Sequence, residues 1–254
     1  MRVLIDTGWI VSVLLVAVRI GAALVMTPLL SFGGIPATTR VALVLALAVA
    51  LVSAVVLPPA TALASIGGLL AAATSEFVIG GLLAFGVFTA FAAFQLAGRI
   101  MDLQMGFGVA SLIDPATRTQ SPLLGTLLNL VALAVFFAVD GHHLVIRGLA
   151  YSLVQLPPGS SLAALEPAAV VAQFGAMFVF AVALAAPVIF VLLLVDVALA
   201  VMARTMPQMN VFIVSLPLKI MVGLLVLVMS MQYMGPVMER VFEGMFDYWQ
   251  RVLG

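Results

Sequence analysis

Long apolar runs dominate the chain and predict its helices. Short connectors rich in glycine, proline and polar residues separate these runs. Runs of about 20 apolar residues are typical of helices that cross a membrane. The six runs are Trp9–Leu30, Val41–Leu57, Ala62–Gly98, Leu123–Val139, Ala168–Ala203 and Val211–Met234. They predict an all-α, membrane-associated protein with about six hydrophobic segments arranged in helical hairpins.

Two of the runs are longer than a bilayer requires. Ala62–Gly98 and Ala168–Ala203 would each extend over about 50 Å as an unbroken helix, whereas the hydrocarbon core is about 30 Å thick. Each run is therefore either a tight hairpin of two half-length helices or one long helix covered by neighbouring subunits. The second interpretation predicts a hetero-oligomeric complex.

Composition supports an integral membrane protein. Of 254 residues, 65% are hydrophobic and only 8% are charged. Ten basic residues balance ten acidic ones, so no net positive field would attract nucleic acid. There is no cysteine, which excludes disulfides and thiolate sites. Asp6 and Arg19 interrupt the amino-terminal pattern, which favours a first membrane helix over a cleaved signal peptide.

Four charged residues lie within the apolar runs and are candidates for function. They are Arg19, Glu76, Asp196 and Lys219. Ionisable residues in membrane segments either pair with one another or line a transport path. One interpretation is structural ion pairing. The alternative is a carrier for a small solute or ion, in which Glu76, Asp196 and Lys219 couple transport.

The chain offers little other chemistry. Asp140-Gly141-His142-His143 resembles a set of metal ligands, but neighbouring helical residues should point to different sides, and the chain has no further histidine. We therefore expect no metal site, and a helix end capped by Gly141. Gly106-Phe107-Gly108 is only a fragment of a dinucleotide fingerprint. We expect neither a cofactor nor an enzyme active site.

The stretch 105–122 interrupts the apolar pattern in the middle of the chain. Glycines, prolines and polar residues there leave backbone groups that hydrocarbon cannot satisfy. Gly106 and Gly108 permit unusual backbone angles, Phe107, Leu112 and Ile113 supply apolar bulk, and Asp114-Pro115 favours a turn. The stretch is either a plain connector or a mobile plug.

Proline-rich connectors suggest an internal boundary. Leu156-Pro157-Pro158-Gly159 should end a helix, because proline lacks an N–H donor and disfavours a helical conformation of the residue before it. Beyond it, two apolar arms flank a short turn at 204–210. We expect a helical region over 1–160 and a separate helical hairpin over 161–254.

The order of several motifs resembles the FliR family of the flagellar type III export gate. The resemblance rests on LQMGFGVASLIDPATRTQSPLLGTLLNLVALAVFFAVDGHHL, then LPPG, then APVIFVLLLVDVALAVMARTMPQMNVFIVSLPLKIMVGL. It covers most of the chain. Related injectisome proteins share the fold, but Asp114-Pro115-Ala116 favours the flagellar branch.

The resemblance implies a function and partners. A FliR-like chain would join FliP, FliQ and FlhB in the bacterial inner membrane, at the flagellar basal body, and unfolded flagellar subunits would leave through this gate. Residues 1–160 would resemble FliP and residues 161–254 would resemble FliQ. The loop 106–122 would plug the closed pore. The roles of its individual residues are our own hypotheses: Phe107, Leu112 and Ile113 obstruct the pore, and Gly106 and Gly108 are hinges. Asp114-Pro115 makes the turn, and Asp114 with Arg118 forms a polar latch.

Overall fold

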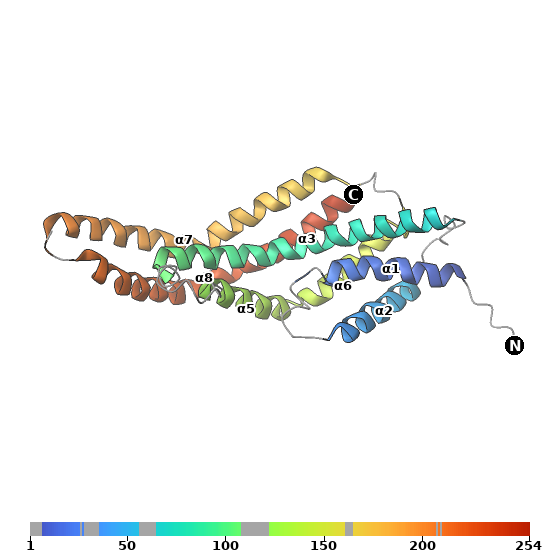
Figure 1. Cartoon of the computed structure of the whole chain (residues 1–254), viewed down its shortest axis with the longest axis horizontal. Helices are drawn as coiled ribbons and strands as arrows, with labels where there is room; N and C mark the ends of the chain where they lie inside the picture. The colour runs from blue at the N-terminus through green and yellow to red at the C-terminus, as the bar shows by residue number, and fades with distance from the viewer. Residues whose placement is uncertain are drawn as a thin grey trace. The chain divides into compact units, whose positions relative to one another are not determined.

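The computed structural model is entirely helical over the residues that it describes, which are 7–25, 27, 36–55, 65–107, 122–160, 165–206, 208 and 210–254. These residues form seven helices and no strand, which confirms the predicted all-α class. The helices are α1 (Thr7–Val25), α2 (Ala37–Ala54), α3 (Ile66–Met105), α5 (Leu123–Ala138), α6 (Gly141–Gln155), α7 (Pro167–Thr205) and α8 (Val211–Leu253), labelled in Figure 1.

Each of the six apolar runs contributes to one helix, but the pattern missed α6 and the last part of α8. In α6 the buried positions include Val145, Leu149, Ser152 and Leu153, at helical spacing. Its exposed side chains are mixed: His143, Arg147 and Gln155 are polar, and Ile146 and Val154 are apolar. The end of α8 is similar, because Met238, Phe242 and Met245 are buried between charged residues. Both segments are amphipathic and therefore show no continuous apolar run.

The two overlong runs form single helices and not hairpins. Helices α3 and α7 have 40 and 39 residues, which corresponds to lengths of about 60 Å at the usual rise per residue. Pro187 lies within α7, and Pro217 and Pro236 lie within α8, without ending these helices. Neighbouring helices can satisfy the backbone groups that a proline frees in a membrane segment.

The chain covers its long helices unequally. In the most apolar window of each helix, 61% of α3 is buried within the chain, against 28% of α7 and 17% of α8. Many of the exposed side chains of α7 are large and apolar. They include Val171, Phe174, Phe178, Val179, Val182, Phe190, Leu193, Leu194, Val197 and Val201. Such a surface requires lipid or a partner protein to cover it.

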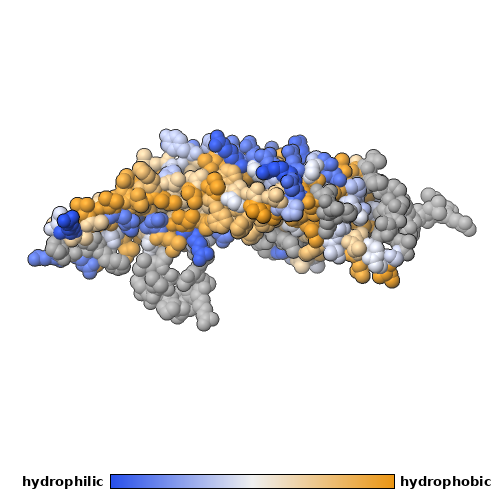
Figure 2. Space-filling model, turned by 90° about the horizontal axis from the view of Figure 1, so that it is seen from above, coloured by the Kyte–Doolittle hydropathy of each residue, from blue (hydrophilic) through white to orange (hydrophobic). Residues whose placement is uncertain are grey.

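Among the residues that the structure describes, four helices are long and apolar enough to cross a membrane. They are α2, α3, α7 and the part of α8 from Ile213 to Leu253, and α5 with α6 would add a fifth if the pair is one broken span. Broad apolar areas lie between hydrophilic patches on the face drawn in Figure 2. The chain is therefore a hydrophobic membrane protein, as its composition predicts.

The helices are distributed over two compact units. Unit 1 comprises Met1–Thr89, Asp140–Phe174 and Glu243–Gly254, and unit 2 comprises Ala90–Val139 and Gly175–Phe242. Helices α3, α7 and α8 each contribute one part to each unit. The predicted division between residues 160 and 161 rests on sequence pattern and stays a prediction.

Two aromatic residues near the end of α8 connect helices within unit 1. Tyr248 Oη donates a hydrogen bond to the carbonyl oxygen of Leu82 at 3.1 Å, and Trp249 Nε1 donates to that of Leu83 at 3.0 Å. The Trp249 ring lies against Gly148 of α6, where an added Cβ would come within 2.1 Å of Cζ3. These contacts join the end of α8 to the interior of α3 and the middle of α6.

Unit 2 has an aromatic core. Phe91, Phe94, Phe136 and Phe242 are buried, and their neighbouring rings lie 5.3 to 5.8 Å apart between centroids. Phe94 and Phe242 are stacked, and the other pairs are tilted or edge-to-face, which are the arrangements that aromatic rings prefer. The cluster joins α3, α5 and α8 within the unit.

Candidate functional site

A buried ion pair between Arg19 and Glu76 lies in unit 1. Arg19 comes from α1 and Glu76 from α3, and both side chains are 0% exposed. Arg19 Nε donates to Glu76 Oε2 at 2.6 Å, and Nη2 donates to Oε1 at 3.0 Å. Two parallel N–H···O bonds make a bidentate pair, the strongest geometry for this type of contact.

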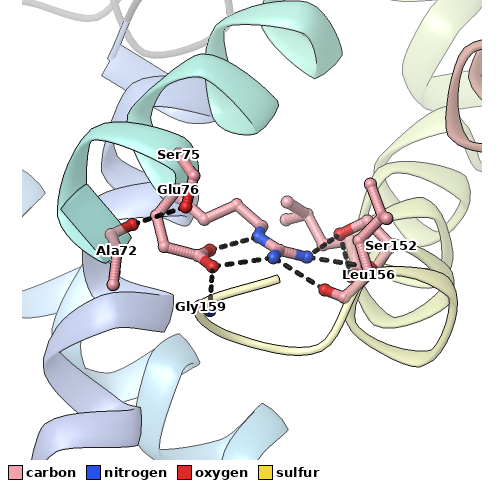
Figure 3. A network of polar contacts seen from close by, with 8 residues as sticks. Ala72, Ser75, Glu76, Ser152, Leu156 and Gly159 are labelled. Atoms are coloured by element: carbon pink, nitrogen blue, oxygen red, sulfur yellow. Dashed lines mark hydrogen bonds and ion pairs between the residues drawn. The ribbon is translucent and has the colours of Figure 1, made fainter. Parts of the chain in front are cut away.

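The remaining donors of the guanidinium bind the end of α6. Nη1 donates to the carbonyl oxygen of Ser152 at 2.8 Å and to its Oγ at 3.2 Å, and Nη2 donates to the carbonyl oxygen of Leu156 at 2.8 Å. Glu76 Oε1 also accepts from the backbone N–H of Gly159 at 3.0 Å. Figure 3 shows Glu76 and Gly159 on one side of the network and Ser152 and Leu156 on the other.

The network suits a structural role better than a transport role. All five N–H groups of an arginine have acceptors here. A buried charge is tolerated only when it is paired and hydrogen-bonded, and this arrangement satisfies both conditions. A carrier needs a group that exchanges partners with its substrate, whereas Glu76 is held by two chain segments.

The other two candidate charges form a second ion pair, in unit 2. Lys219 Nζ of α8 contacts Asp196 Oδ1 of α7, and their side chains are 22% and 42% exposed. The four residues selected from the sequence are thus brought together as two separate pairs. This second pair lies on helices whose apolar surface is largely exposed in the chain.

The described part of the candidate plug is its beginning. Gly106 follows α3 with φ +86°, a left-handed conformation that favours glycine, and its N–H donates to the Leu103 carbonyl oxygen at 3.2 Å. Phe107 is half-buried. The other predicted plug residues, Gly108, Leu112, Ile113, Asp114, Pro115 and Arg118, lie outside the described residues.

Asp102 connects the two helices on either side of this loop, a role that the sequence analysis did not predict. It is 5% exposed, and its carboxylate accepts hydrogen bonds from the N–H groups of Leu124, at 3.1 and 3.2 Å, and Gly125, at 3.4 Å. The first N–H groups of a helix need acceptors from outside it, and Pro122 supplies no side-chain cap to α5. Because the residue before α5 is a proline without a capping side chain, the sequence indicated that another residue must accept from these N–H groups.

The expectation for the Asp140 turn was partly wrong. Asp140, not Gly141, adopts the left-handed conformation, with φ 56°, and Gly141 is the first residue of α6. Aspartate is among the few residues that tolerate this conformation. The two histidines also do not diverge, because their ring centroids are 4.1 Å apart. One ligand atom each from Asp140, His142 and His143 lies within 4.8 Å of the others.

Comparison with known proteins identifies the family. A family model for "Bacterial export proteins, family 1" matches residues 10–245. The flagellar biosynthetic protein FliR of Bacillus subtilis (strain 168) is 38% identical over 234 residues, which cover 91% of this chain and 90% of that protein. FliR of Escherichia coli (strain K12) is 31% identical over 176 residues, 69% of this chain and 67% of that protein.

A relative from another system matches a shorter region. The Yop proteins translocation protein T of Yersinia pestis is 31% identical over 156 residues, which are 60% of each chain. The names of these three relatives describe flagellar biosynthesis and translocation, and none describes a reaction. The resemblance found in the sequence motifs is confirmed: the chain belongs to the FliR family, within family 1 of the bacterial export proteins.

Proposed function

We propose that this chain is a structural and channel-forming subunit, not an enzyme, of the flagellar type III export gate in the bacterial inner membrane. The match of residues 10–245 to bacterial export proteins carries this proposal. In this assignment the chain assembles with FliP, FliQ and FlhB at the flagellar basal body. Unfolded flagellar proteins pass through the conduit that these subunits form.

The exposed helices support assembly with other subunits. Helices α7 and α8 are longer than a bilayer core, and most of their apolar windows are not buried within the chain. Partner helices would cover the part of this surface that lipid does not reach. The proposed division into a FliP-like region, 1–160, and a FliQ-like hairpin, 161–254, places these arms in the hairpin.

The loop 106–122 is proposed to plug the resting conduit. The arrangement at its two ends supports this assignment. Gly106 permits a sharp change of direction after α3, and Asp102 binds the start of α5 just beyond Pro122. A segment with fixed ends can move its middle without separating the helices that carry it.

Purification from native membranes tests the proposed assembly. A tagged chain that restores motility to a strain lacking its own FliR would be extracted in mild detergent, and co-purifying proteins would be identified by mass spectrometry. We expect FliP and FliQ in constant ratio to the tagged chain. Isolation of the chain alone, from cells in which export is active, would contradict the assignment.

A further inference from the structure

We propose that Asp140, His142 and His143 form a binding site for a zinc ion. The two imidazoles and one carboxylate are donors of the types that zinc takes in proteins. One ligand atom of each residue lies within 4.8 Å of the others. This cluster takes no part in the Arg19 network, in the contacts of Asp102 or in the proposed plug.

Local backbone geometry brings the three side chains together. Asp140 takes the left-handed conformation directly before α6, and its carbonyl oxygen accepts from the N–H of His143 at 2.9 Å and of Leu144 at 3.3 Å. Asp140 and His143 are therefore one helical turn apart and lie on the same side. The His142 ring lies against the His143 ring, at 4.1 Å between centroids.

The separation between Asp140 and His143 suits a tetrahedral ion. Ligand atoms about 2.1 Å from a tetrahedral zinc lie about 3.4 Å from one another, and His143 Nδ1 is 3.5 Å from Asp140 Oδ1. These two side chains are 61% and 73% exposed, so an ion can reach them and small side-chain rotations can complete the geometry. The fourth position would hold water.

The donor set favours zinc over magnesium or calcium. Imidazole nitrogens suit zinc and its neighbours among the transition metals, whereas magnesium and calcium prefer sites built only from oxygen. The Asp140 carboxylate also offsets the partial positive charge at the amino terminus of α6. Binding would fix the left-handed Asp140 to the first turn of α6.

The composition of the chain removes competing zinc ligands of the histidine and cysteine types from the test. His142 and His143 are its two histidines and it has no cysteine, so the rest of the chain supplies neither imidazole nor thiolate. The full chain, purified in detergent with a tag that contains no histidine, would be titrated with zinc by calorimetry. Bound metal would be measured by elemental analysis after dialysis.

We expect one zinc per chain and at least about tenfold weaker binding for His143→Gln and Asp140→Asn. Asp247→Asn is the matched control, because Asp247 is an exposed acid outside the cluster, and it should bind as the unsubstituted chain does. Circular dichroism would show that the variants are folded. Independently of any variant, zinc should protect both histidines of the unsubstituted chain from diethyl pyrocarbonate.

Either of two results would overturn the proposal. One is that the unsubstituted chain takes up no zinc at 100-fold molar excess of the ion and its histidines are not protected. The other is that His143→Gln binds zinc with unchanged stoichiometry and affinity. Neither result bears on the export function, because the site is argued without it.

Discussion

The carboxylate of Asp102, in the last turn of α3, accepts a hydrogen bond from the backbone N–H of Leu124, in the first turn of α5. The two residues lie on either side of the loop that interrupts the apolar pattern. A single acidic side chain therefore both caps a helix and closes the base of the loop.

Removal of this cap should destabilise unit 2. Asp102→Ala leaves the N–H groups of Leu124 and Gly125 without their acceptor in a buried position, which costs about 1–3 kcal/mol. Asp102→Asn keeps one acceptor oxygen and should lose less. Thermal unfolding of the purified chain in detergent measures both changes.

Thr126→Ala is the matched control for that experiment. Thr126 lies in the same first turn of α5, is exposed, and its hydroxyl donates to the Pro122 carbonyl oxygen. Its removal should change the unfolding temperature little. Equal losses for Thr126→Ala and Asp102→Ala would show that the Asp102 contacts contribute nothing specific.

Removing one partner of the Arg19–Glu76 pair should destabilise the chain more than replacing both partners by apolar residues. Arg19→Met leaves the Glu76 carboxylate buried with one backbone donor, Gly159, and loss of one partner of a buried ion pair typically costs 3–5 kcal/mol. Arg19→Met with Glu76→Leu should recover part of that loss. The yield and thermal stability of the two single variants and the double variant measure the coupling.

The same double variant distinguishes a structural role of the two charges from a role in transport. If the pair is structural, export measured by secretion of flagellin should return together with stability. A stable double variant that exports nothing would instead assign the charges themselves to the mechanism.

The second ion pair should contribute little to the stability of the chain by itself. Lys219 and Asp196 are partly exposed, and exposed pairs contribute about 0–1 kcal/mol. Lys219→Met should therefore shift the unfolding temperature of the chain in detergent much less than Arg19→Met. A loss as large as that of Arg19→Met would show that the pair is part of the chain's own core.

The contact between Gly148 and Trp249 should not tolerate a methyl group. In Gly148→Ala the new Cβ would overlap the Trp249 ring, and such overpacking costs about 1–3 kcal/mol. Gly81→Ala is the control, since nothing lies within 4 Å of its added Cβ and alanine favours the helix. A red-shifted tryptophan emission in Gly148→Ala alone would report displacement of Trp249, and identical behaviour of both variants would contradict the packing.

Hydropathy predicted most of the helices because burial in lipid or protein requires continuous apolar surface. It missed α6, where Arg147, Tyr151 and the two histidines interrupt the apolar positions that include the buried Val145 and Leu149. The hydropathy pattern also could not show which polar residues pair with one another. Arg19 and Glu76 are 57 positions apart and Asp102 and Leu124 are 22 apart, so only the folded chain shows which residues meet. The expectation that the two histidines point to different sides was wrong, since their ring centroids lie 4.1 Å apart.

A disulfide crosslink tests the central claim most directly. The chain has no cysteine, so Ser111→Cys introduces a single thiol into the proposed plug, and a stalled export substrate carries a second. We expect a substrate-dependent crosslink at Ser111→Cys and none at Thr74→Cys, an exposed position on α3. Absence of the crosslink, with export intact and the variant assembled in its complex, would show that the loop is not in the conduit.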